Sequence, residues 1–198
     1  CEAQQSRAQD LALSVALPPS RARRLLLRPL RARTKLMGWE AAIGGTTMGG
    51  ILSYGESAEL FLLGVLAGGA LGAGSPWLWP ESVPLDMANT TALIGAQHLT
   101  MFTLTAIGAE LDRKDWENRT PALLGLGGVL GTGLGIALIH AEPTDGEMAS
   151  AYAGIYWGIG LSISALNLAY AWDEEQYQAP ALIAGANLGA LGGYALGH

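Results

Sequence analysis

Charged residues are scarce in this chain, at 14% of its 198 residues, and only one cysteine is present. The net charge of -6, without a basic patch in the loops, argues against a nucleic-acid partner. Valine and phenylalanine are also rare, which makes the sequence poor strand material. Because the single cysteine is Cys1, neither an intramolecular disulfide nor a cysteine-based metal site is expected.

Catalytic motifs are missing as well. The sequence has no nucleophile motif, no glycine-rich phosphate loop ending in Lys-Ser or Lys-Thr, and no histidine pair at metal-binding spacing. We therefore predict a protein that is not an enzyme, with no catalytic residues, no cofactor and no metal.

Long apolar segments are what the sequence does contain. Half of the residues are apolar, and each of six segments has roughly the 17–25 residues that a helix needs to cross a membrane. Charge or proline marks the loops between them. The segments are 37–54, 58–74, 88–109, 121–141, 148–172 and 180–197. We predict an all-α membrane domain over residues 36–198.

Glycines recur every four residues in three of these segments. On a helix this spacing places them on one face, where the backbone of another helix can approach closely. The glycines are Gly64, Gly68 and Gly72, then Gly127, Gly131 and Gly135, then Gly185, Gly189, Gly193 and Gly197. Together with an internal repeat around Pro121 and Pro180, they predict three glycine-zipper hairpins, over about 36–80, 87–141 and 148–198.

One segment fits a different fold. Large apolar residues at alternate positions from Ile155 to Ile163 have the period of a barrel strand. A β-barrel in the outer membrane, acting as a porin-like channel, is therefore kept as an alternative.

Residues 1–35 differ from the rest of the chain, because they contain eight of its eleven basic residues. Pro18, Pro19 and Pro29 should break any long helix there. We predict a tether followed by a basic segment on lipid headgroups or on an acidic neighbouring subunit. The basic residues of that segment are Arg21, Arg23, Arg24, Arg28, Arg31, Arg33 and Lys35.

The first residues, Cys1-Glu2-Ala3-Gln4-Gln5-Ser6, resemble the start of a mature bacterial lipoprotein. This resemblance implies a lipid on Cys1 and a place in the bacterial cell envelope. Lipidation puts the N-terminus outside the cytoplasm, against the positive-inside rule for such a basic segment. That conflict favours the outer membrane.

A few polar residues within the apolar segments are candidates for a site: Glu40, Gln97, His98 and Thr100. Ionisable groups at membrane depth are costly and suggest function. Glu40 lies near the start of its segment, where it could reach the interface. For His98 we predict a hydrogen bond between helices, and for Trp39 a place at the membrane interface.

Three functional hypotheses follow. The first is a structural or pore-forming subunit of a homo-oligomer or a larger envelope assembly, with membrane lipid as a partner. It depends on the number of small residues, including Gly44, Gly45, Gly49 and Gly50, which is more than three hairpins require. The second is the porin-like channel, and the third is a transport or energy-coupling subunit that uses Glu40 or His98.

Overall fold

Helices dominate the part of the chain that the computed structural model describes, residues 19–52, 57–79, 85–111, 116–169 and 175–198. No strand is found in these residues, so the all-α prediction is confirmed for them. A short 3-10 helix, η2 (Ser75–Trp77), accompanies the longer helices. The latter are α2 (Pro19–Leu52), α3 (Ala58–Gly74), α4 (Met87–Leu111), α5 (Trp116–Ile139), α6 (Asp145–Leu168) and α7 (Glu175–Gly197).

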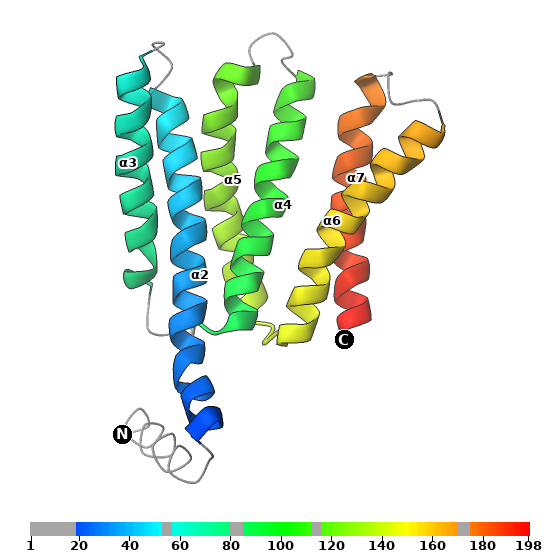
Figure 1. Cartoon of the computed structure of the whole chain (residues 1–198). Coiled ribbons are helices and arrows are strands. Elements are labelled where there is room, and N and C mark those ends of the chain that lie inside the picture. Colours follow the sequence, from blue (N-terminus) through cyan, green and yellow to red (C-terminus); the bar gives the residue numbers. More distant parts are fainter. Residues whose placement is uncertain (1–18, 53–56, 80–84, 112–115, 170–174) are drawn as a thin grey trace.

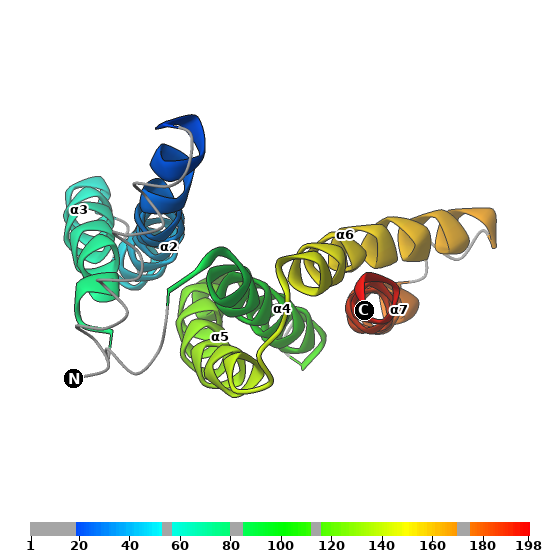
Figure 2. The same ribbon diagram turned by 90° about the horizontal axis from the view of Figure 1, so that it is seen from below.

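The helices form three antiparallel pairs that stand side by side in a row (Figure 1). The pairs are α2 with α3, α4 with α5, and α6 with α7, and packing is most extensive within each pair. From below, α4 occupies the centre of the row and contacts α2, α5, α6 and α7 (Figure 2). The start of α2 and the end of α7 both lie at the lower end of the upright helices in Figure 1. We call this end of the helices the basic end.

Within the described residues, four segments are long and apolar enough to cross a membrane: Ala58–Trp77, Met87–Leu111, Arg119–Ile139 and Gln178–Gly197. The sequence predicted six such segments, and those in α2 and α6 are not among the four. The first half of α2 is rich in arginine, and α6 begins with Asp145 and Glu147 and continues with several serines and tyrosines. Each of these more polar helices packs against an apolar partner.

The predicted helix break at Pro29 is also wrong. α2 continues through this proline to Leu52, and so crosses the predicted boundary at residue 35. A proline inside a helix removes one backbone hydrogen bond and can bend the helix without ending it. Figure 1 shows the first turns of α2 bent away from the rest of its axis. Residues 1–18, the first part of the predicted tether and basic segment (1–35), lie outside the described residues.

The segment with strand-like alternation, Ile155 to Ile163, lies within α6. The strand interpretation is therefore wrong for this segment. A repeat of four residues contains a repeat of two, so glycines spaced for a helix face also alternate. Gly154 and Gly158 face α7, whereas Trp157 points outward and is 73% exposed.

Glycines lie where the paired helices approach each other. At each of these positions a Cβ atom would come closer than 3.0 Å to the backbone of the partner helix, so only glycine allows the observed approach. The facing positions are Gly64 with Gly49, Gly68 with Gly44, Gly72 with Glu40; Gly127 with Met101, Gly131 with Gln97, Gly135 with Leu93; Gly185 with Gly158, Gly189 with Gly154, Gly193 with Ser150, and Gly197 with Glu147.

The additional glycines of α2 also face neighbours within the chain. A Cβ at Gly45 or Gly49 would meet Val65 of α3, and one at Gly50 would overlap the ring of Pro121 in α5. The surplus of glycine is thus used inside the molecule, and it does not by itself indicate a second subunit.

A capping box begins α6 near the basic end. The Thr144 hydroxyl accepts a hydrogen bond from the Glu147 N–H, and a Glu147 carboxylate oxygen accepts one from the Thr144 N–H. The other oxygen lies 2.6 Å from His198 Nδ1, which ties the end of α7 to the start of α6.

We expect this cluster to make stability pH-dependent in acid. Hydrogen bonds from His198 and then from Thr144 lower the pKa of Glu147 from the usual 4.5 to about 2. The contribution of the ionised Glu147 carboxylate to the free energy of unfolding is complete above pH 4.5 and is lost as the pH falls towards 2. Thermal unfolding in detergent should show this loss in the wild type and not in Glu147→Gln. An equal acid sensitivity in both proteins would contradict the assignment.

Candidate functional site

Gln97 is the centre of a polar cluster that joins three helices. It lies ten residues after Met87, the first residue of α4, and is only 1% exposed. Its Nε2 group donates to Glu40 Oε1 at 2.7 Å and to Thr132 Oγ1 at 2.8 Å. Its Oε1 atom accepts a hydrogen bond from Trp39 Nε1 at 2.7 Å. Both amide donors and the carbonyl are therefore in use, and the amide has one defined orientation.

Helix packing positions these partners. Trp39 and Glu40 are consecutive residues of α2, and both reach Gln97 on the central helix. Thr132 follows Gly131, whose missing side chain lets the α4 backbone at Gln97 come close. The Thr132 hydroxyl in turn donates to the carbonyl of Gly128, one turn earlier in α5.

The Glu40 side chain borders a cavity of about 230 Å³ on the side of α3. The cavity is also lined by Thr132, Ser75, Leu78 and Trp79, of which the last three belong to the segment after α3. This open pocket thus combines apolar side chains with the half-buried Glu40 and two residues that carry hydroxyl groups. Such a space suits water or a small cation.

His98 faces away from this cavity, towards α6. Its Nδ1 atom lies 3.1 Å from the Tyr152 hydroxyl, which lies 3.1 Å from that of Tyr156. The His98 ring also packs on Trp39, with 4.5 Å between the ring centroids. Trp39 therefore contacts both His98 and Gln97, and links the two polar groups.

No match to this chain is found among protein-family models, curated proteins or solved structures. Within the described residues, no three histidine, cysteine, aspartate or glutamate side chains lie close enough together to hold a metal ion. The site therefore has to be interpreted from its own geometry.

The four predicted site residues do not form one group. Glu40 and Gln97 are in direct contact through a hydrogen bond. His98 lies on the α6 side of α4, and the Thr100 hydroxyl donates to the carbonyl of Gly127 in α5 at 2.6 Å.

Four residues of the site were not predicted as site residues from the sequence: Trp39, Thr132, Tyr152 and Tyr156. Trp39 was expected at the interface but is hydrogen-bonded to Gln97. The tyrosines could have been noticed, because two tyrosines four residues apart in an apolar segment share a helix face. Thr132 gave no signal, since a threonine among glycines is ordinary in a membrane helix.

The basic segment is described only in part. Arg31 and Lys35 are exposed, Arg33 lies 5.0 Å from the centre of the Trp77 ring, and Lys35 Nζ donates to Thr91 Oγ1 at 3.1 Å. Partial burial lowers the pKa of Lys35. The side chains of Arg21, Arg23, Arg24 and Arg28, like Cys1, lie outside the described residues.

Proposed function

We propose that the protein spans a membrane as three glycine-zipper hairpins and acts as a transport or energy-coupling subunit, with Glu40 binding a proton or a small cation. Four helices of membrane-spanning length and composition support the location. The observation that carries the function is the Glu40 carboxylate, held by buried Gln97 in a residue that lines an open pocket.

The depth of Glu40 is the first step. Ten residues of helix rise about 15 Å, so Gln97 would lie well inside a hydrocarbon layer roughly 30 Å thick. Glu40 Oε1 is 2.7 Å from this amide and would share its depth. A carboxylate there is costly unless it has a role, and such residues mark ion and proton pathways in membrane proteins.

Access to Glu40 is the second step. The cavity of about 230 Å³ has room for a few waters, at roughly 30 Å³ each. It is bounded by Ser75, Leu78 and Trp79, which follow the end of α3 nearest the basic end. We propose that a proton or cation reaches Glu40 from this end.

The test is flux across vesicles that contain the purified protein and a pH-sensitive dye. We expect the wild type to relax an imposed proton or cation gradient, and Glu40→Gln to slow that relaxation about tenfold or more, since it removes the intramembrane charge. Glu59→Gln is the matched control, because Glu59 is exposed in the first turn of α3. Wild-type flux in Glu40→Gln, or vesicles that stay tight with the wild type, would contradict the proposal.

A structural subunit of a homo-oligomer or envelope assembly is the second candidate. It is supported by the open row of helix pairs (Figure 2). The outer helices also expose large apolar side chains. Leu62, Leu63 and Leu66 of α3 and Leu188 and Leu196 of α7 are each more than half exposed. Lipid or neighbouring subunits would cover them.

The basic segment and the anchor complete the proposal. Two of the four spanning segments end or begin near Arg33 and Lys35, so these side chains would meet lipid headgroups at that surface. Trp77, 66% exposed beside Arg33, suits the same interface. A lipid on Cys1 and an outer-membrane location remain predictions.

A further inference from the structure

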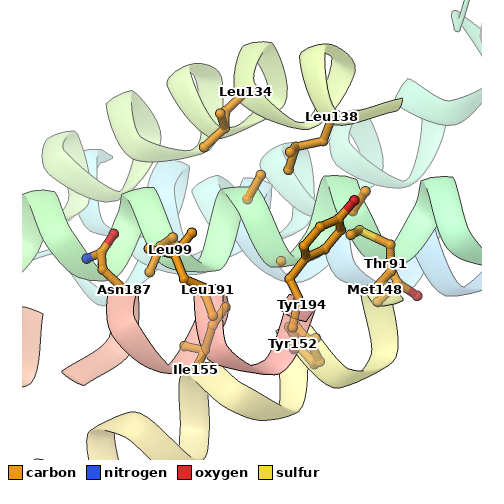
Figure 3. A pocket seen from close by; sticks show the side chains of 15 residues that line it. Thr91, Leu99, Leu134, Leu138, Met148, Tyr152, Ile155, Asn187, Leu191 and Tyr194 are labelled. Atoms are coloured by element: carbon orange, nitrogen blue, oxygen red, sulfur yellow. The ribbon is translucent and has the colours of Figure 1, made fainter. Parts of the chain in front are cut away.

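A groove of about 460 Å³ separates the α4–α5 pair from the α6–α7 pair (Figure 3). All four of these helices line it, and most of the lining is aliphatic or small, as at Leu99, Leu134 and Ile155. The polar exceptions are Thr91, Tyr152, Asn187 and Tyr194. The groove is separate from the Glu40 cavity, which lies on the α2 and α3 side of the molecule.

The groove runs along the helices from the basic end towards the middle. Thr91, Met148 and Tyr194 lie at one end, and Leu99 and Asn187 at the other (Figure 3). From Thr91 to Leu99 the α4 helix rises about 12 Å. Three of the four lining helices are among those able to span a membrane, so the groove would lie within the hydrocarbon layer and begin near its surface.

We propose that this groove binds one acyl chain of a membrane lipid. An apolar space of this kind does not hold water well, whereas a hydrocarbon chain matches both its chemistry and its elongated shape. Thr91, whose hydroxyl accepts a hydrogen bond from Lys35 Nζ, and Tyr194 lie near the basic end, where the polar part of the lipid would be.

Photo-crosslinking in vesicles tests this inference. The probe is a phosphatidylglycerol with a diazirine in the middle of one acyl chain, and mass spectrometry locates the labelled peptides. We expect label in the wild type at groove residues such as Leu99, Leu134 and Leu191. In Gly95→Leu it should fall to the level on the exposed leucines of α3, because position 95 lines the groove beside Tyr152.

Gly133→Leu is the matched control, since a side chain there meets no atom within 4 Å, and it should leave the groove label unchanged. Ala190→Leu, which fills the groove from α7, should act like Gly95→Leu if both variants keep wild-type helicity. Equal labelling of the groove and the α3 face in the wild type would overturn the inference. Undiminished groove label in both filled variants, or protein–protein crosslinks through groove residues, would do so as well.

Discussion

Replacing Gly158 with alanine is expected to push α6 and α7 apart and to destabilise the protein by about 2 kcal/mol. Gly158 is buried, and its new methyl group would overlap the carbonyl oxygen of Gly185. The obstacle is backbone, which cannot rotate away as a side chain could. The free energy of unfolding, from reversible denaturation in mixed micelles, is the quantity to measure.

Gly160 provides the control on the same helix. A Cβ there meets nothing within 4 Å, so Gly160→Ala adds the same methyl group without a clash. Alanine also favours the helix, and we expect stability to be unchanged or raised by up to about 1 kcal/mol. The free energy of unfolding should therefore fall in Gly158→Ala but not in Gly160→Ala. Equal effects would show that the close approach of α6 and α7 does not contribute to stability.

Replacing Gln97 with leucine is the second change with a large expected effect. The side chain is nearly isosteric, but Glu40 and Trp39 lose their hydrogen bonds to Gln97, and Thr132 keeps only the one to the Gly128 carbonyl. Leaving buried polar groups unpaired costs about 1–3 kcal/mol, and here one of them is a carboxylate. We expect a loss of stability in that range and, in the vesicle assay, a flux defect like that of Glu40→Gln.

Thr105→Val tests whether any loss of a polar group in α4 would do the same. The Thr105 hydroxyl donates to the carbonyl of Met101 in its own helix, so its removal should have little effect on stability or flux. The double variant Glu40→Gln with Gln97→Leu should be less destabilised than the sum of the two, because the residues are in contact. Additive effects would show that the pair is not coupled.

The positions of the helices follow from local features of the sequence. Apolar runs of membrane length, separated by charge and proline, predicted 58–74 and 88–109, close to the observed α3 and α4. The apolar runs and the charged or proline-containing loops between them each depend on neighbouring residues alone, so the helices can be predicted without a structure. The predicted segments 37–54 and 148–172 lie in α2 and α6, which are not among the four helices apolar enough to span a membrane within the described residues.

The site depended on tertiary structure. Gln97 meets Thr132 and Glu40 across 35 and 57 residues of sequence, and no periodicity within one segment specifies such pairs. The rotation of each helix about its axis also mattered, since it turned His98 towards α6 and its neighbour Gln97 towards α2 and α5. That rotation is set by which glycine faces which backbone. The spacing of the glycines predicted close helix packing, but which residue faces each glycine depends on how the helices pack together.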